Sequence, residues 1–329
     1  MGLIPQRDYF DKDIANSDNT SGYYIIERDD FVYNPRKSSD APYGPISRYT
    51  YSEAGIVSPL YLCFRAKGNV DSNFFEWYFR SSAWHRYIYM TGDSGARHDR
   101  VSIKDTDFFA MPIRYPSTTE QEKIASFLTA IEERISSQQL LVDNLKKYKR
   151  GLLSVSFADT ASWRKKKLGD MCCIRTGKLD ANAMVEGGKY PFFTCARERY
   201  TIDSFAFDTD ALLISGNGAN VGYIHHYTGK FNAYQRTYVL DQFSENINYV
   251  HVFLDRFLSS RIDAEKKAGN TPYIVLSTLS DMEIFLPDET MMKNLVEMFA
   301  QIDKHIENSN QILECFISIR KGLLQQLFI

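Results

Sequence analysis

Two long stretches of the sequence place hydrophobic residues three or four positions apart. The first follows Pro116 and has no Gly or Pro before Gly151. Thr119 and Glu122 near its start are spaced as a capping box, which is typical of a helix N-terminus. We predict that both stretches are long helices, because this spacing puts the apolar residues on one face. The predicted packing positions are Ile124, Leu128, Ile131, Ile135, Val142 and Leu145 in the first helix, and Leu295, Phe299, Ile302, Ile306, Leu313 and Phe316 in the second.

The two stretches are copies of each other. Met111–Phe157 and Met282–Phe328 align without a gap at an offset of 171 residues, with ten identical positions. A match of this length indicates an internal duplication. Heptad-like spacing favours pairing of the two helices as a coiled coil; the alternative is two amphipathic helices that each pack on their own domain. The pattern is interrupted at matching positions, Gln138 and Lys149 in one copy and Ser309 and Arg320 in the other.

The regions in front of the helices have a different pattern. They consist of short aromatic and β-branched runs broken by Gly, Pro, Asn and Asp, which are typical of strands and turns. Each also contains one shorter helix candidate, Asn73–Ile88 and Asn248–Lys267. The predicted fold class is therefore α+β with a pseudo-two-fold repeat of mixed domain and long helix. The predicted boundaries are 1–116, 117–157, 158–287 and 288–329.

Composition narrows the choice of function. The chain has 329 residues, more than one core usually holds, and 44% are hydrophobic. The net charge of −2 requires any nucleic-acid binding to depend on local patches. The five cysteines lack zinc-binding spacing, which predicts reduced thiols and a cytoplasmic protein. No apolar run is long enough to predict a membrane span.

Several motifs resemble one known family. "MPIRYPSTTEQEKIASFL", "LKKYKRGLL" and the opening "WRKKKLGDMCCIRTG" of the second repeat are similar to the specificity (S) subunit of Type I restriction–modification systems. The resemblance spans essentially the whole chain. It implies two target-recognition domains, each reading half of a bipartite, asymmetric DNA target, and two conserved spacer helices that pair as an antiparallel coiled coil. The first repeat lacks a counterpart of the opening at Trp163–Gly177, so we expect the first target-recognition domain to be N-terminally truncated.

The same resemblance implies the partners. These are double-stranded DNA, two methylation subunits and the restriction subunits of the same system, with no membrane. S-adenosylmethionine, ATP and Mg²⁺ are expected on the partner subunits, and neither a cofactor nor a metal on this chain. We therefore expect a non-catalytic DNA-recognition subunit with no catalytic residues. The alternatives are a fragment of a complete restriction–methylation enzyme, which the absence of cofactor and catalytic motifs disfavours, and a truncated specificity remnant or coiled-coil adaptor that binds methylation subunits without full DNA specificity.

Candidate DNA contacts come from polar and basic residues between the predicted strands. Asn, Gln and Arg can read base edges, whereas Lys and Arg hold phosphates. The glycines of "ISGNGANVG" (Ile214–Gly222) are spaced for a turn or a DNA-facing loop rather than for a dinucleotide site. For each candidate the alternative is an ordinary surface residue. The candidates are Asn34, Arg36, Lys37, Arg97, His98 and Arg100 in the first domain, and Lys178, Asn217, Asn220, Tyr223, Gln235, Arg236 and Asn270 in the second.

Overall fold

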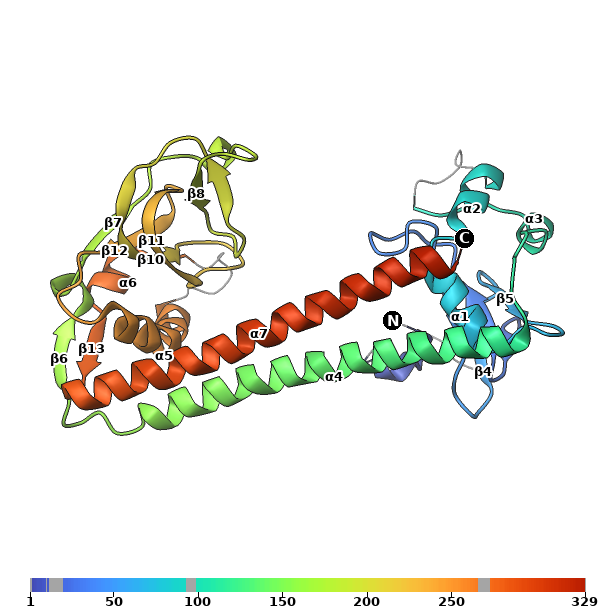
Figure 1. Cartoon of the computed structure of the whole chain (residues 1–329), viewed down its shortest axis with the longest axis horizontal. Helices are drawn as coiled ribbons and strands as arrows, with labels where there is room; N and C mark the ends of the chain where they lie inside the picture. Colours follow the sequence, from blue (N-terminus) through green and yellow to red (C-terminus); the bar gives the residue numbers. More distant parts are fainter. Residues whose placement is uncertain (1, 10, 12–19, 93–98, 266–272, 329) are drawn as a thin grey trace. The chain divides into compact units, whose positions relative to one another are not determined.

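The computed structural model describes residues 2–9, 11, 20–92, 99–265 and 273–328 (Figure 1). Contacts between residues divide the chain into two compact units. Unit 1 combines Met1–Leu140 with Asn310–Ile329, and unit 2 is the continuous segment Leu141–Ser309. Both unit boundaries lie within the two long helices, so each helix contributes to both units. The predicted domain boundaries, which treat each helix as a separate element, stay a prediction.

Unit 1 is built around a small antiparallel sheet. Its order is β3-β2-β5, and a separate two-stranded sheet pairs β1 with β4. The strands are β1 (Tyr24–Ile26), β2 (Asp30–Tyr33), β3 (Ile46–Arg48), β4 (Gly55–Val57) and β5 (Leu62–Arg65). A short 3-10 helix, Gln6–Asp8, precedes them, and the helices α1 (Ser72–Arg80), α2 (His85–Thr91) and α3 (Asp105–Phe109) follow.

The predicted helix Asn73–Ile88 is wrong in one respect, because it is two helices. The chain breaks between Arg80 and His85, where side chains take over the hydrogen bonds that a continuous helix would make. Ser81 Oγ donates to the carbonyl oxygen of Tyr78, and Trp84 Nε1 donates to that of Phe79. Trp84 is thereby buried beneath the break, and its ring contacts Phe79 edge-on. The apolar pattern concealed the break because both helices bury aromatic residues.

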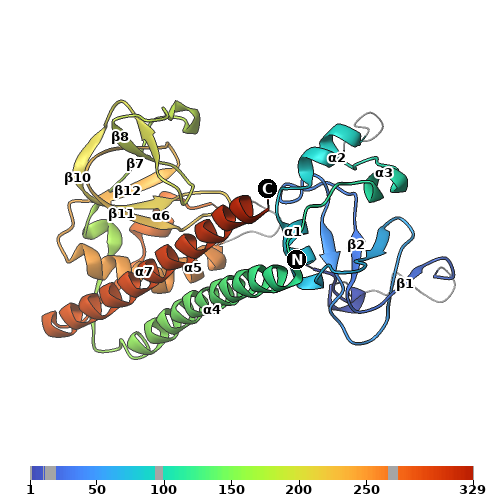
Figure 2. The same cartoon turned by 45° about the vertical axis from the view of Figure 1, so that its right-hand side comes forward.

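Unit 2 contains a larger sheet of order β7-β12-β10-β11-β8-β9, and a separate pair, β13-β6 (Figure 2). All strand pairs are antiparallel except β11 with β8. The strands are β6 (Arg164–Lys167), β7 (Cys173–Thr176), β8 (Tyr190–Phe193), β9 (Tyr200–Ile202), β10 (Phe207–Ser215), β11 (Ile224–Ala233), β12 (Thr237–Asp241) and β13 (Glu283–Leu286). The helical elements are the 3-10 turns Leu168–Asp170 and Ala181–Ala183, α5 (Ile247–Glu265) and α6 (Leu276–Ser280).

The long helices are α4 (Thr118–Ser156) and α7 (Glu289–Leu327). Unit 1 holds the N-terminal part of α4 and the C-terminal part of α7, and unit 2 holds the other two parts. Within each unit the helices therefore pair antiparallel (Figures 1 and 2). None of the twelve predicted packing residues is exposed. Gln138 and Ser309, which interrupt the pattern, are buried as well.

The residues at the other two interruptions pair across the helices. In unit 1, Arg320 of α7 forms an ion pair with Glu132 of α4 at 2.6 Å. In unit 2, Lys149 of α4 forms an ion pair with Asp303 of α7 at 2.7 Å. The two pairs are related by the internal repeat, and they replace apolar contacts with opposite charges at equivalent points. The duplication is therefore preserved in contacts as well as in sequence, and the predicted α+β fold class with paired long helices is confirmed.

Each long helix ends on the core of a unit. Phe157, one residue beyond α4, contacts the rings of Phe253 and Phe257 on α5 in unit 2. Phe328, one residue beyond α7, contacts Phe74 and Tyr78 on α1 in unit 1. Both phenylalanines are buried. The last turn of each helix is thus fixed to an aromatic helix of a mixed domain.

Candidate nucleic-acid interface

The six described candidates of unit 2 lie in loops that meet at the ends of its strands. We call these loops the unit 2 loop cluster, residues 177–180, 194–199, 216–223 and 234–236. Hydrogen bonds join each loop to a neighbour: Gly216 N donates to Arg236 O at 2.9 Å, and Gln235 N donates to Leu179 O at 2.9 Å. Lys178, Asn217, Asn220, Tyr223, Gln235 and Arg236 all belong to this cluster. Asn270 lies outside the described residues.

Two glycines allow the loops to approach so closely. A Cβ atom on Gly177 would lie 1.8 Å from the carbonyl oxygen of Ala233, and one on Gly216 would lie 2.3 Å from that of Arg236. No side chain fits at such distances, so these positions require glycine. The segment Gly216–Gly222 joins β10 to β11, which confirms that this glycine-rich stretch is a loop.

The loop between β8 and β9 adds residues that the sequence reasoning missed. Arg197 Nε donates to Asn220 Oδ1 at 3.3 Å, and its guanidinium group lies 5.3 Å from the centre of the Tyr223 ring. Arg199 lies 5.8 Å from the ring centres of both Phe193 and Tyr227. The signal available in the sequence was the run "CARERY", basic and aromatic residues between two strand-like segments.

His225 is buried behind this surface. Its Nε2 lies 3.2 Å from the carbonyl oxygen of Ala196, and its ring contacts Tyr223 edge-on at 4.8 Å. Burial lowers the pKa of His225, and the charge of Arg199 lowers it further, although the Ala196 carbonyl and Glu198 act in the opposite direction. The lowered pKa favours the neutral form of the ring, which packs edge-on against Tyr223. His226, the next residue on β11, instead points to Asp210 at 2.8 Å, so the two histidines face opposite sides of the strand.

Four of the candidates in unit 1 also come together. Asn34, Arg36 and Lys37 directly follow β2, and Arg36 pairs with Arg100 through an isolated β-bridge. Lys37 N donates to Asp99 O at 2.8 Å, and Asn34 Oδ1 accepts from Arg36 N at 3.0 Å. A pocket of about 650 Å³ lies beside this bridge, and Arg100, Tyr24 and Tyr61 are among its lining residues. Arg97 and His98 lie outside the described residues.

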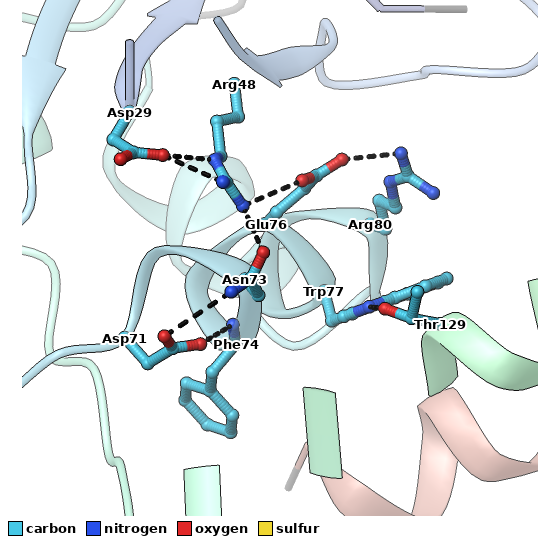
Figure 3. A network of polar contacts seen from close by, with 9 residues as sticks. All are labelled: Asp29, Arg48, Asp71, Asn73, Phe74, Glu76, Trp77, Arg80 and Thr129. Atoms are coloured by element: carbon cyan, nitrogen blue, oxygen red, sulfur yellow. Dashed lines mark hydrogen bonds and ion pairs between the residues drawn. The ribbon is translucent and has the colours of Figure 1, made fainter. Parts of the chain in front are cut away.

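Two other arginines of unit 1, Arg48 and Arg80, pair with carboxylates of the same unit, and Arg48 is largely buried. Arg48 of β3 donates to Asp29 and Asn73 and forms an ion pair with Glu76, which also binds Arg80 (Figure 3). Asp71 caps α1 by accepting from the backbone N–H of Phe74. In the same region Trp77 Nε1 donates to Thr129 Oγ1 of α4 at 3.2 Å. This network fixes α1 between the sheet and the long helix, and its charges are neutralised internally.

Two further kinds of feature are absent from the described part of the chain. There, no three His, Cys, Asp or Glu side chains are grouped as ligands for a metal ion. Among the described helices, none combines the length and the apolarity that crossing a membrane requires.

Comparison with known proteins finds similarity to one family. Residues 161–315 match the Type I restriction modification DNA specificity domain. The chain is 37% identical over 163 residues to the Type I restriction enzyme EcoDI specificity subunit of Escherichia coli, a match that covers 50% of this chain and 36% of that relative. It is 22% identical over 303 residues to the MjaIX specificity subunit of Methanocaldococcus jannaschii, with 79% and 69% covered. The chain thus spans about a third of the length of the first relative.

Two solved structures share the fold. One is the Type-I restriction-modification S subunit from M. genitalium, with a TM-score of 0.60, 16% identity and 96% of this chain and 87% of the other covered. The second is a chain of a type I R-M system, with a TM-score of 0.56, 17% identity and 92% and 82% covered. At such identities the likeness concerns the fold alone.

Proposed function

We propose that the chain is a specificity subunit of a Type I restriction–modification system, as its similarity to that family suggests, that it recognises a bipartite, asymmetric DNA sequence, and that it has no catalytic activity of its own. In this proposal each unit reads one half of the target. The observation that carries the proposal is the unit 2 loop cluster, in which all six described candidates meet beside Arg197 and Arg199. Loops that combine basic, amide and aromatic side chains suit both phosphate and base contacts.

The rest of the complex is proposed on the same basis. Methylation subunits would bring S-adenosylmethionine, and restriction subunits would bring ATP and Mg²⁺, so that this chain supplies only recognition and assembly. The five cysteines are free thiols, which agrees with a cytoplasmic location.

An exposed apolar stripe on each long helix supports two equivalent partner sites. In unit 2, Leu141 and Tyr148 of α4 are seven residues apart and are 46% and 59% exposed. In unit 1, the repeat-related Ile312 and Ile319 of α7 are 46% and 45% exposed. Large apolar side chains at heptad spacing suit the packing of a further helix. We propose that each stripe binds one of two identical methylation subunits.

A binding experiment tests the proposed function. The chain would be purified together with its methylation subunit, and sequences would be selected from a randomised library of DNA duplexes at a fixed salt concentration. We expect enrichment of one split sequence with two defined halves. Binding of all duplexes with equal affinity would contradict sequence recognition and would favour the adaptor or truncated remnant.

A further inference from the structure

Arg197 differs from several other arginines of the described structure in the groups that hold its side chain. Arg164, Arg175 and Arg320 each form an ion pair with a carboxylate. The partners of Arg197 are neutral, namely the amide oxygen of Asn220 and the ring of Tyr223. Its side chain is therefore oriented without neutralisation of its charge.

The orientation of Arg197 is itself supported by the neighbouring loop. Asn220 accepts from Arg197 Nε through its Oδ1 atom and donates through Nδ2 to the carbonyl oxygen of Cys195 at 3.2 Å. Because both ends of the amide are used, Asn220 cannot rotate without losing one contact. Tyr223 is in turn packed on the buried ring of His225. The guanidinium plane is thus fixed from the side by Asn220 and from its face by Tyr223.

The bond to Asn220 uses only Nε of Arg197, so the two terminal amino groups of this exposed residue are left for another acceptor. Two parallel N–H donors fit two adjacent acceptor atoms. In DNA, guanine presents such a pair in the major groove, O6 and N7. A phosphate offers a similar pair, but phosphate contacts do not require a fixed side chain, and the exposed Lys178 and Arg236 on neighbouring loops suit that role.

We propose that Arg197 reads a guanine in the half-site bound by unit 2, and that Asn220 and Tyr223 are the residues that position it. The proposal rests on the proposed function, since it assigns one base contact within the DNA interface. In this proposal the amide of Asn220 orients Arg197 and does not itself read a base.

The test repeats the duplex selection with variants of the full chain in complex with its methylation subunit. For the wild type we expect a guanine at one position of one half-site, preferred roughly 5- to 150-fold over other bases. Arg197→Ala is expected to abolish that preference and to leave the other positions of both half-sites unchanged. Arg197→Lys should also lose most of it, because one ammonium group cannot replace the planar pair of donors.

Further variants separate positioning from folding. Tyr223→Ala should reduce the guanine preference, whereas Tyr223→Phe, which keeps the ring, should retain it. Arg164→Ala serves as the matched control, because Arg164 lies on β6, away from the loop cluster, in an ion pair with Glu245. Thermal unfolding of each variant establishes that the fold is intact.

Three results would overturn the proposal. An unchanged preferred sequence for Arg197→Ala would remove Arg197 as a base reader while leaving the proposed function in place. An equal loss of affinity for all duplexes, with a shallower salt dependence, would make Arg197 a phosphate contact. If the wild type selected no sequence at all, the proposed function would fail together with this inference.

Discussion

Phe157 and Phe328 make the same kind of contact in different units. Each is the last apolar residue of a repeat, and each inserts its ring among the aromatic side chains of a helix in a mixed domain. The sequence showed that the two phenylalanines correspond, but it did not show what they touch. Their partners lie far away in the sequence, and for Phe328 they precede the whole of unit 2.

Removing either ring is expected to destabilise one unit selectively. Phe328→Ala should lower the free energy of unfolding of unit 1 by about 3–5 kcal/mol, and Phe157→Ala should do the same in unit 2, because each change empties a buried aromatic site. Limited proteolysis with identification of the cut sites would show which unit opens. Val155→Ala, at an exposed position of α4, is the matched control. Equal protection of both units in both variants would contradict the expectation.

The residues of the candidate interface were only partly predictable. Asn34, Arg36, Lys37 and Arg100 could be chosen from the sequence because polar and basic residues stand out between strand-like runs, and the structure brings them together. Whether they contact DNA stays a prediction. Arg197 could not be chosen in this way, since its importance depends on Asn220 and Tyr223, which come from a different loop. These loops come together because of the order of the strands in the sheet, which no local sequence pattern indicates.

At the scale of elements, the ion pairs between α4 and α7 differ between the units in one respect. Arg320 and Glu132 form a simple pair, whereas Lys149 contacts both Asp303 of α7 and Asp255 of α5, at 2.7 Å each. Burial lowers the pKa of Lys149, but the two carboxylates outweigh it and raise the pKa overall. Lys149 therefore joins both long helices to the mixed domain of unit 2.

Exchanging the two charges of each ion pair should distinguish the simple pair in unit 1 from the three-residue cluster in unit 2. Arg320→Glu alone is expected to destabilise unit 1 by about 1 kcal/mol, the upper range for a partly exposed pair, and addition of Glu132→Arg should recover most of that loss. The corresponding exchange of Lys149→Asp with Asp303→Lys should not recover, because Asp255 then faces a second carboxylate. Denaturant unfolding of the single and double variants provides the measurement. Full recovery in both units would show that Asp255 makes no contribution.

We expect the exposed stripes on the long helices to contribute to binding of the methylation subunit. Tyr148→Ala and Ile319→Ala should each weaken binding of the methylation subunit by more than about 1 kcal/mol, since large side chains at a helix interface carry much of the binding energy. Isothermal titration of the purified chain with that subunit measures the effect. Lys147→Ala, next to Tyr148 and also exposed, is the control. If only one of the two stripes responded, the two partner sites would not be equivalent.

The elements themselves were predicted well where one period extends far along the chain. Both long helices were predicted, and the structure has them as Thr118–Ser156 and Glu289–Leu327. The shorter prediction at Asn73–Ile88 was wrong at its middle, because Ser81 and Trp84 end one helix by hydrogen bonds to carbonyl oxygens. A long periodic pattern predicts a helix reliably even where single residues deviate from it. In a pattern of only a few turns, two residues such as Ser81 and Trp84 are enough to make the prediction wrong.

At the scale of the whole molecule, three histidines in the two units share one property. Burial lowers the pKa of His85 in unit 1 and of His225 and His251 in unit 2. For His251, Lys149 and His226 lower the pKa further, while Asp255 and Asp303 raise it. Each ring is thus less readily protonated in the folded protein than in the unfolded chain, where the pKa is about 6.5.

The lowered pKa values of these histidines make the stability of the folded protein depend on pH. Below about pH 6.5 the unfolded chain binds more protons than the folded protein, so the free energy of unfolding should fall as the pH drops. Denaturant unfolding at about pH 7.5 and about pH 6 measures this change. His251→Gln should reduce the pH sensitivity of unit 2. A stability that rises on acidification over this range would contradict the expectation.

Because the ribosome makes the chain from its N-terminus, the two units are completed in a fixed order. Unit 2 is one uninterrupted segment, so all of its residues are available before the last part of α7 has been made. The core of unit 1 includes Phe328, with Leu323 and Leu324 packed against it, and all three residues follow unit 2 in the sequence. Unit 1 can therefore be completed only after the whole of unit 2 has been translated. A ribosome that stalls between Ser309 and Leu323 would hold a chain in which unit 2 is complete and unit 1 lacks part of its core.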